Sequence, residues 1–302
     1  MLRFGLFGTG HWAAQTHAAA LDAHPQAELA GVWGRDPGKA RSLAERHGVP
    51  AFDDMDALLD AVDAVAVALP PDVQADIAVR AATAGRHLLL DKPLALSTVD
   101  ADRVVTAAAQ AGVASVVFFT SRFQPNVAAF LASTAAVGGW HGAQVTMFAS
   151  IFQPGSPYGR SPWRREHGGL WDVGPHALSV ILPVLGRVTR VAAMDGPRGA
   201  VHLLLDHAFA GATSTVSLSL DAPPEAKRNE VLFHGENGVE RVPPGDGSPV
   251  TAFGVALDQL IEEVDAGTRD HHCDVRFGRE VVAVLDAAGT ACTEGRTVSL
   301  PG

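Results

Sequence analysis

The sequence predicts an α/β protein of two domains: an N-terminal Rossmann domain on a doubly wound parallel sheet, and a C-terminal α+β domain on a large, mostly antiparallel sheet. The chain has 302 residues, which exceeds the roughly 100 to 200 residues of a single domain. Over the first ~120 residues, short apolar runs alternate with alanine-rich amphipathic segments, as in βαβ units. Beyond Phe123, longer strand-like runs follow one another with few helices between them. We therefore expect domains at residues 1–120 and 121–302.

Each element of the first domain follows from a short apolar run or from helical spacing of apolar residues. The expected strands are Leu2–Phe7, Glu28–Trp33, Asp63–Leu69, His87–Leu90 and Ser115–Phe119. The expected helices are Trp12–Ala23, Pro37–His47, Asp72–Ala84 and Thr98–Ala111. Because strands and helices alternate along the chain, the strands are expected to run parallel.

In the second domain, a helix at Pro125–Ala135 precedes a series of strands. The expected strands are Ala143–Phe152, Val188–Met194, Ala200–Asp206, Thr213–Leu220 and Glu230–His234. The Gly-, Pro- and Ser-rich segment Gln153–Pro162 is short and flanked by aromatic residues, which predicts an ordered loop. A turn-rich connector at Pro243–Pro249 precedes a last helix at about Phe253–Gly267.

Composition and charge exclude several classes of partner. The formal net charge is -10 and the sequence pI is about 5.7, whereas nucleic acids and anionic membranes select basic patches. We therefore expect a small-molecule partner, no nucleic acid and no membrane. Cys273 and Cys292 are the only cysteines, which predicts neither a disulfide framework nor a zinc site and fits a reducing cytoplasm. We expect no signal peptide, and no apolar stretch approaches the ~18 residues of a membrane-spanning helix.

The first chemical motif lies between the first expected strand and the first expected helix. Its residues are Gly8, Thr9, Gly10, His11, Trp12 and Ala13. Glycines here permit a tight turn and the close approach of a pyrophosphate, which the free N–H groups of a helix N-terminus attract. The spacing is common, but its place between a strand and a helix predicts dinucleotide binding. The alternative is a glycine-rich turn without a ligand.

The end of the second strand bears on which dinucleotide is bound. A carboxylate at this place binds the ribose 2′-hydroxyl of NAD and would repel a 2′-phosphate. Here Gly34 takes the place of the acid, which leaves Arg35 available to pair with a 2′-phosphate. NADP is therefore preferred. NAD remains possible, because Asp36 could be the acid, displaced by two residues.

The next motif lies at the carboxyl end of the third expected strand, where Leu69 is followed by Pro70 and Pro71. Open α/β sheets bind their ligands at the carboxyl ends of the strands. Prolines lack N–H groups and make a rigid edge there, which could contact the nicotinamide ribose or serve as an ordinary strand-to-helix loop.

Asp91, Lys92 and Pro93 directly follow the next expected strand, at the same expected edge of the sheet. An ammonium group in this crevice would stabilise developing charge on a substrate oxygen and hold the carbon ready for hydride transfer. The alternative is a surface ion pair between Lys92 and Asp91.

Taken in order, these motifs resemble the Gfo/Idh/MocA family, named for glucose-fructose oxidoreductase and inositol dehydrogenase. That family has a Gly-x-Gly-x-x-Ala turn, a Leu-Pro-Pro loop and usually Glu-Lys-Pro, where this chain has Asp91. The resemblance continues over the second domain. The residues that carry it there are Ser121-Arg122-Phe123-Gln124-Pro125, Trp163-Arg164, Gly168–His176 and Glu294–Val298.

The resemblance implies an NAD(P)-dependent oxidoreductase acting on a secondary alcohol or ketone of a sugar, cyclitol or related polyol, bound in the cleft between the domains. It implies that Asp91 and Lys92 lie at the cofactor, that Asp172 binds or orients the reacting hydroxyl beside Lys92, and that His176 moves its proton. Asp172 and His176 would share a face of one helix if that helix begins near Leu170 to Asp172, because Pro175 is tolerated in a first turn.

The resemblance has three further implications. The peptide bond between Lys92 and Pro93 is expected to be cis. The second-domain sheet is expected to form a homodimer or homotetramer. Arg122, Trp163, Arg164 and Tyr158 could line the substrate side; the alternative for them is domain packing or exposed loop contacts.

Several residues depart from the family or invite other interpretations. Gln74 stands where the family often has histidine, Ser179 where it often has aspartate, and its three-glycine run is reduced to Gly168 and Gly169. Two other hypotheses stay open: an NAD-dependent lyase or glycosidase that uses transient oxidation, and a non-catalytic NAD(P)-binding sensor. Further histidines are interpreted as packing or surface residues, and no metal is expected at His271-His272-Cys273 because the spacing of a closed site is missing. These histidines are His11, which could touch the cofactor, His17 and His207.

Overall fold

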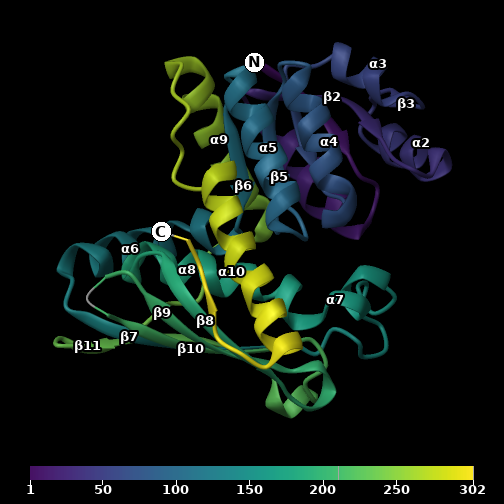
Figure 1. The fold of residues 1–302 in the computed structure, drawn as a ribbon. Helices are drawn as coiled ribbons and strands as arrows, with labels where there is room; N and C mark the ends of the chain where they lie inside the picture. Colours follow the sequence, from purple (N-terminus) through teal and green to yellow (C-terminus); the bar gives the residue numbers. More distant parts are fainter. Residues whose placement is uncertain (210, 302) are drawn as a thin grey trace. The chain divides into compact units, whose positions relative to one another are not determined.

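The computed structural model describes residues 1–209 and 211–301, and the chain forms two compact units (Figure 1). The first unit contains Met1–Gln124 and Gly247–Arg279, and the second contains Pro125–Asp246 and Glu280–Gly302. Each unit is built on one β-sheet. In the described part of the chain, no helix is both long enough and apolar enough to cross a membrane.

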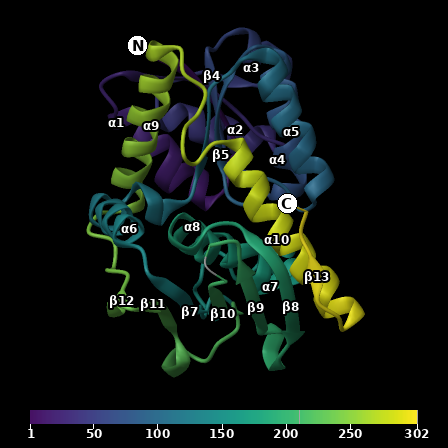
Figure 2. The same cartoon turned by 60° about the vertical axis from the view of Figure 1, so that its left-hand side comes forward.

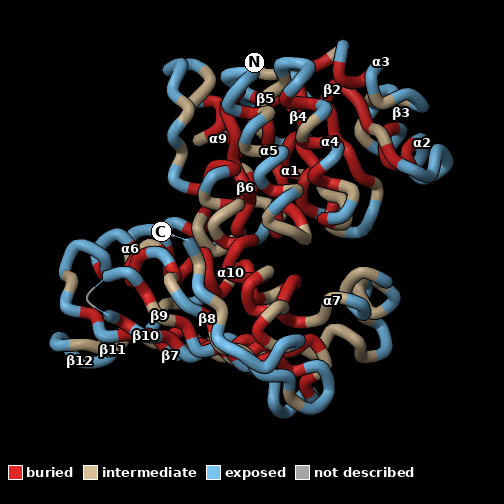
Figure 3. The backbone as a smooth tube through the Cα atoms, in the orientation of Figure 1, coloured by how far each residue is buried: buried red, intermediate tan, exposed pale blue. Residues whose placement is uncertain are grey.

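The first unit has a six-stranded sheet in the order β3-β2-β1-β4-β5-β6, and all its pairings are parallel. The strands are β1 (Leu2–Phe7), β2 (Ala27–Trp33), β3 (Ala51–Phe52), β4 (Ala64–Val67), β5 (His87–Asp91) and β6 (Ser115–Phe118). This is the Rossmann order of strands. The chain adds strands on one side of β1 up to β3 and then continues on the other side with β4, so the switch point lies between β1 and β4. Strands β4 and β6 are buried along their length (Figure 3), as expected for a parallel sheet covered on both faces. The predicted parallel Rossmann sheet is confirmed.

Helices cover both faces of the parallel sheet. They are α1 (Ala19–Ala23) with the π-helix η1 (Ala13–Ala18) before it, α2 (Pro37–Arg46), α3 (Met55–Asp60), α4 (Pro71–Thr83), α5 (Thr98–Ala111) and α9 (Pro249–Ala266). Figure 2 shows α1 and α9 on one side of the strands and α4 and α5 on the other. A short 3-10 helix, Thr120–Phe123, follows β6. Local signals set the ends of α5: the Ser97 hydroxyl accepts a hydrogen bond from the Asp100 N–H at 3.1 Å, and left-handed Gly112 ends the helix.

Helix α9 belongs to the first unit, although the sequence interpretation placed it in the second domain. The helix contacts α1, β5 and β6, and the Phe253 ring lies 4.9 Å from the Phe118 ring, edge to face. The compact units therefore differ from the predicted division in residues 247–279. Helical spacing shows which face of α9 is apolar, but it does not show which sheet will cover that face.

The second unit has a seven-stranded sheet in the order β12-β11-β7-β10-β9-β8-β13. The strands are β7 (Trp140–Phe148), β8 (Val188–Asp195), β9 (Val201–His207), β10 (Thr213–Ser219), β11 (Arg228–Gly235), β12 (Gly238–Arg241) and β13 (Val298–Ser299). Strands β7 and β10 pair in parallel, and the other pairings are antiparallel. The expectation of a large, mostly antiparallel sheet is confirmed.

Three longer helices belong to the second unit. They are α6 (Pro125–Val137), α7 (Pro162–Asp172) and α8 (Gly174–Leu185). A fourth helix, α10 (Val275–Glu294), begins in the first unit and belongs to the second from Glu280 onward. Helix α8 contacts α6, α7 and β7, and its apolar residues are buried. Two short 3-10 helices lie at Pro197–Gly199 and Pro224–Ala226. The sequence interpretation missed α10 altogether, although its buried residues Val281, Leu285 and Ala288 recur at helical spacing.

Candidate active site

The turn after β1 has a backbone that requires glycine. Gly8 has φ +135°, and a Cβ at this position would overlap the carbonyl oxygen of Ala68. The Gly8 N–H donates to the Trp33 carbonyl oxygen at 2.9 Å, and the Ala68 N–H donates to the Phe7 carbonyl oxygen at 2.9 Å. These bonds place the turn at the carboxyl edge of the sheet, where the strand order reverses between β1 and β4.

The same turn leaves room for a ligand before the helix that follows. A Cβ on Gly10 would meet no atom within 4 Å, whereas Ala13 is only 1% exposed and fixes the helix against the sheet. His11 and Trp12 begin this helix, and N–H groups of a first turn have no acceptor within the helix. Such groups bind pyrophosphate, so the predicted Gly8–Ala13 segment fits a dinucleotide.

Gly34 packs directly against the glycine turn, because a Cβ on Gly34 would lie 2.6 Å from Thr9 Cγ2. Arg35 is exposed beside it. The Asp36 carboxylate caps α2, since its Oδ1 accepts hydrogen bonds from two N–H groups of the first helical turn at 3.0 and 3.1 Å. Asp36 thus has a structural task at the N-terminus of α2.

The residues after β4 lie at the same edge. Strand β4 ends at Val67, which pairs with Phe7 of β1. Leu69 is half-buried, Pro70 is the N-cap residue of α4, and Pro71 is its first residue. A proline costs no hydrogen bond at a helix start, so this rigid loop is compatible with α4 as well as with cofactor contact.

Asp91 is the last residue of β5, and Lys92 and Pro93 follow it at the carboxyl edge. The peptide bond between Lys92 and Pro93 is cis, as the resemblance implies. The Lys92 N–H donates to Asp91 Oδ1 at 2.8 Å. The aspartate side chain is therefore bonded to the backbone at the start of the turn that carries the lysine.

A buried histidine lies against the Asp91 carboxylate. His17 is 0% exposed, and its Nε2 lies 3.8 Å from Asp91 Oδ2. The imidazole is 4.2 Å from the Phe253 ring between centroids, and neither ring nitrogen has a hydrogen-bond partner among the described residues. Burial lowers the pKa of His17 to about 3, so the ring is neutral. Sequence reasoning treated His17 as a packing residue and missed its neighbour, because the spacing within one helix does not identify the strand beside it.

In the second unit, two of the predicted substrate residues lie on α7 and form an ion pair. Arg164 Nε donates to Asp172 Oδ2 at 2.9 Å, and Asp172 is buried. The helix is interrupted between them by Gly168, which has φ +62° and ψ -157°. The Arg164 guanidinium also lies over the rings of Tyr158 and Trp163, at 4.7 and 4.5 Å from their centroids. Two aromatic rings thus pack against the guanidinium of the Arg164–Asp172 pair.

His176 lies in α8, whereas Asp172 is the last residue of α7. The expectation that one helix carries both residues is therefore wrong: α7 ends at Asp172 and α8 begins at Gly174, because Pro175 has no N–H with which to continue the hydrogen bonding of α7. Pro175 does lie in a first helical turn, as predicted. Ser179, which departs from the family, is buried, and its hydroxyl donates to the His176 carbonyl oxygen of the same helix at 2.9 Å.

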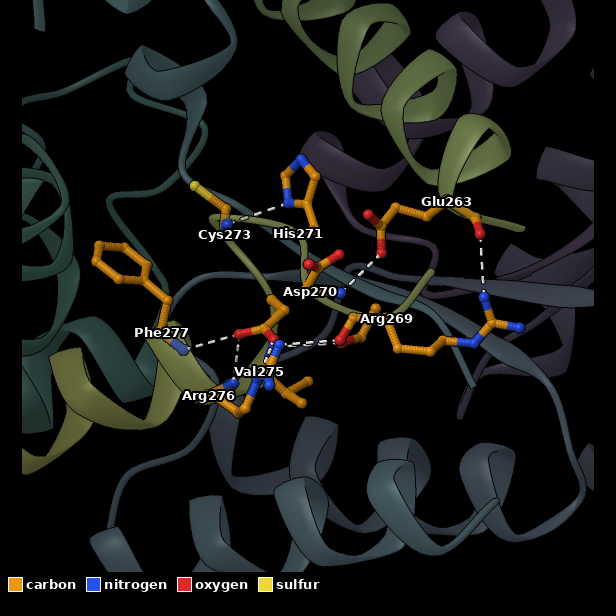
Figure 4. A network of polar contacts seen from close by, with 10 residues as sticks. Glu263, Arg269, Asp270, His271, Cys273, Val275, Arg276 and Phe277 are labelled. Atoms are coloured by element: carbon orange, nitrogen blue, oxygen red, sulfur yellow. Dashed lines mark hydrogen bonds and ion pairs between the residues drawn. The ribbon is translucent and has the colours of Figure 1, made fainter. Parts of the chain in front are cut away.

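The connector between α9 and α10 contains the His271-His272-Cys273 cluster. Both ring nitrogens of His271 have partners: Nε2 lies 2.8 Å from Gln259 Oε1, and Nδ1 accepts from the Cys273 N–H at 3.0 Å (Figure 4). Burial lowers the pKa of His271 to about 3 and raises the pKa of the Cys273 thiol to about 12. Among the described residues, no group of three or more His, Cys, Asp or Glu side chains could hold a metal ion.

Figure 4 also shows how this connector is fixed in the first unit. The Asp270 N–H donates to a Glu263 carboxylate oxygen at 3.1 Å, and Asp274 Oδ1 accepts from the Phe277 N–H at 3.0 Å. The Phe277 ring in turn lies 5.6 Å from the Arg122 guanidinium carbon. Arg122, expected on the substrate side, therefore has a packing contact within the first unit.

The fold and the turn geometry of the first unit define a dinucleotide-binding Rossmann protein. The model of the oxidoreductase family with an NAD-binding Rossmann fold, Gfo/Idh/MocA, matches residues 2–119. D-xylose 1-dehydrogenase (NADP(+)) 2 of Haloferax volcanii is 32% identical over 238 residues, covering 74% of this chain and 70% of that protein. The dTDP-3,4-didehydro-2,6-dideoxy-alpha-D-glucose 3-reductase of Streptomyces antibioticus is 27% identical over 310 residues, covering 90% and 92%.

A solved structure agrees with the fold. GenD2 from gentamicin A biosynthesis, in complex with NAD, superposes with a TM-score of 0.86 at 24% identity, covering 100% of this chain and 97% of that one. The chain therefore belongs to the Gfo/Idh/MocA family of oxidoreductases. Its Rossmann domain is the NAD(P)-binding part of an enzyme.

Proposed function

We propose that this enzyme transfers a hydride between NADP and a secondary alcohol or ketone carbon of a sugar, cyclitol or related polyol. The observation that carries the proposal is the position of Lys92, at the end of β5 on the same edge as the Gly8 turn. The names of the two relatives described above both specify a sugar as the substrate. A lysine at this edge suits an oxygen that gains negative charge during the reaction.

Each residue has one task in this proposal. The Gly8–Ala13 segment binds the pyrophosphate through backbone N–H groups, and the bound nicotinamide accepts or supplies the hydride. The Lys92 ammonium binds the substrate oxygen and stabilises its charge as the carbon loses a hydride. The His176 imidazole accepts the proton of the same hydroxyl and returns it in the reverse reaction. Asp172, oriented by Arg164, accepts a hydrogen bond from a substrate hydroxyl.

The preference for NADP rests on Arg35 and Gly34. Thr9 fills the space in which a side chain at position 34 would begin, and Asp36 is used by the N-terminus of α2. The exposed Arg35 guanidinium is then the charged group available for a 2′-phosphate. We expect Arg35→Ala to weaken NADP binding at least tenfold, about 1.4 kcal/mol, and to leave NAD binding within twofold of the wild-type value.

The function is tested by following the absorbance of reduced nicotinamide with a panel of D-xylose, D-glucose, myo-inositol and their oxidised forms, with NADP and with NAD. Net oxidation or reduction of a panel compound, lost in Lys92→Met and His176→Ala, is the expected result. A cofactor that stays bound through purification and shows no net change during substrate cleavage would instead indicate transient oxidation. Cofactor binding without any turnover would indicate a sensor.

We also propose a cytoplasmic homo-oligomer that associates through the second-unit sheet. The cysteines Cys273 and Cys292 are both free thiols, as expected in a reducing compartment. Strands β8, β9 and β12 expose apolar side chains, namely Met194, Leu204 and Val239, which are 72%, 50% and 67% exposed. Light scattering of the purified protein tests the proposal, and Leu204→Glu should shift the mass toward that of one chain.

A further inference from the structure

The turn that carries Lys92 is held by a buried side chain from another element. Gln74 lies in the first turns of α4 and is 1% exposed. Its Nε2 donates to the carbonyl oxygens of Asp91 at 2.6 Å and Pro93 at 3.0 Å, with a longer contact to Leu94 at 3.4 Å. Its Oε1 accepts from the Asp91 N–H at 3.0 Å. One amide thus binds the backbone on both sides of Lys92.

These backbone groups have a specific need for such a partner. Strand β5 ends at Asp91, so the carbonyl groups of Pro93 and Leu94 lie beyond the regular strand. Pro93 and Leu94 are buried, and a buried carbonyl without a hydrogen bond costs about 1–3 kcal/mol. A primary amide supplies donors and an acceptor in one rigid plane, which matches this set of one N–H and several carbonyl groups.

We infer that Gln74 is a positioning residue for hydride transfer: it fixes the backbone of the Asp91–Leu94 turn and thereby the site from which the Lys92 ammonium reaches the substrate. The inference rests on the proposed role of Lys92. A lysine side chain has four rotatable bonds, so its ammonium group is placed accurately only when the lysine backbone is fixed. A displacement of about 1 Å in a catalytic group can cost about 100-fold in rate. Gln74 therefore replaces the family's usual histidine at this position with a side chain that has a defined task.

Three substitutions separate positioning from simple stabilisation. Gln74→Met keeps the length of the side chain and removes all of its hydrogen bonds. Gln74→Glu keeps the acceptor for the Asp91 N–H and turns an oxygen toward the carbonyl groups. Gln74→His provides at most one donor and one acceptor when neutral. We expect kcat to fall about 10- to 100-fold in the Met and Glu variants and about 3- to 10-fold in the His variant.

The matched control is Gln124→Met in the same unit. Gln124 is also buried and forms the same kind of two-way amide contact, donating to the Gly247 carbonyl oxygen at 3.1 Å and accepting from the Gly247 N–H at 2.8 Å. This variant should lose stability as Gln74→Met does, because both leave backbone groups without partners. Its kcat per cofactor-binding site should stay within about twofold of wild type, because the amide contact lies at a different turn.

The experiment measures kcat, KM, the dissociation constant of NADPH by fluorescence, and the deuterium isotope effect, with the panel compound of highest turnover. Positioning predicts a lower kcat, an NADPH dissociation constant within about threefold, and a larger isotope effect, because hydride transfer becomes slower than product release. A wild-type kcat per binding site in both the Met and the His variants would overturn the inference. Lys92→Met is measured in parallel: if it retains turnover, the proposed function has failed, whereas loss in Lys92→Met alone rejects only the role of Gln74.

Discussion

The two units hold their candidate groups in different ways. In the first unit, backbone turns at the ends of parallel strands place the groups: Gly8 adopts φ +135° beside Ala68, and Gln74 binds the turn before and after Lys92. In the second unit, side chains hold one another: Arg164 bonds Asp172 and lies over two aromatic rings in a helix interrupted by Gly168.

This difference separates groups suited to binding the cofactor from groups suited to selecting the substrate. A turn fixed by backbone geometry suits the pyrophosphate, which NAD and NADP share. Side-chain pairs can change one residue at a time without altering the sheet beneath them, and such sites set the choice of substrate. The comparison predicts that a change to the backbone turn at Gly8 disturbs folding and cofactor binding together, whereas a change to the Arg164–Asp172 pair disturbs turnover alone.

The largest expected effect tests the backbone side of this comparison. Gly8→Ala should destabilise the protein by about 3 kcal/mol or more, because the Cβ overlaps the Ala68 carbonyl oxygen and the positive φ disfavours a side chain. Gly10→Ala should fold like wild type, since its Cβ meets nothing within 4 Å, and should only weaken NADPH binding. Urea unfolding and a fluorescence titration measure the two effects. Equal stability of both variants would contradict the account.

The next effect tests the side-chain pair of the second unit. Arg164→Ala leaves the buried Asp172 carboxylate without its guanidinium partner, so kcat should fall about 10- to 100-fold while NADPH binding is unchanged. Arg165→Ala is the control, because the Arg165 guanidinium stacks 4.6 Å from the Phe152 ring centroid and is exposed. Steady-state kinetics with the best panel compound measure kcat for both variants. If both variants keep wild-type kcat, the pair has no part in turnover.

The same difference explains what the sequence could predict. The Gly8 turn and the strand end at Lys92 were predictable, because each is encoded within a few adjacent residues, and the cis bond before Pro93 was implied by the family resemblance. The contacts of His17 and Gln74 with Asp91 were not, because they join helices to a strand 74 and 17 positions further along. For the same reason, α9 was assigned to the wrong unit, since its partner sheet lies more than 100 residues earlier in the chain.

A smaller effect concerns the buried histidine of the first unit. The pKa of His17 is about 3 in the folded protein, whereas the ordinary value is 6.5. Between pH 6.5 and pH 3, His17 is therefore protonated in the unfolded chain and neutral in the folded protein. Its contribution to the free energy of unfolding therefore falls as the pH falls from 6.5 toward 3, by about 2 kcal/mol between pH 7 and pH 5. His17→Phe should reduce the stability loss over that interval by this amount. Urea unfolding at both pH values checks it, and parallel losses in the two proteins would contradict it.

The smallest effect distinguishes a cap from a cofactor contact. Asp36→Ala removes the acceptor for two N–H groups of α2 and should cost about 1 kcal/mol of stability. The ratio of the NADP and NAD dissociation constants should stay within about twofold of wild type, because the carboxylate serves the helix. A tenfold loss of NAD affinity would show instead that Asp36 binds the ribose.

If the proposed function holds, Lys92 takes part in the hydride transfer itself. The decisive measurement is a stopped-flow single turnover of Lys92→Met, saturated with cofactor and with the best panel compound. We expect normal cofactor binding and a rate of nicotinamide absorbance change at least about 100-fold below wild type. A single-turnover rate within a few-fold of wild type, with cofactor bound, would contradict it.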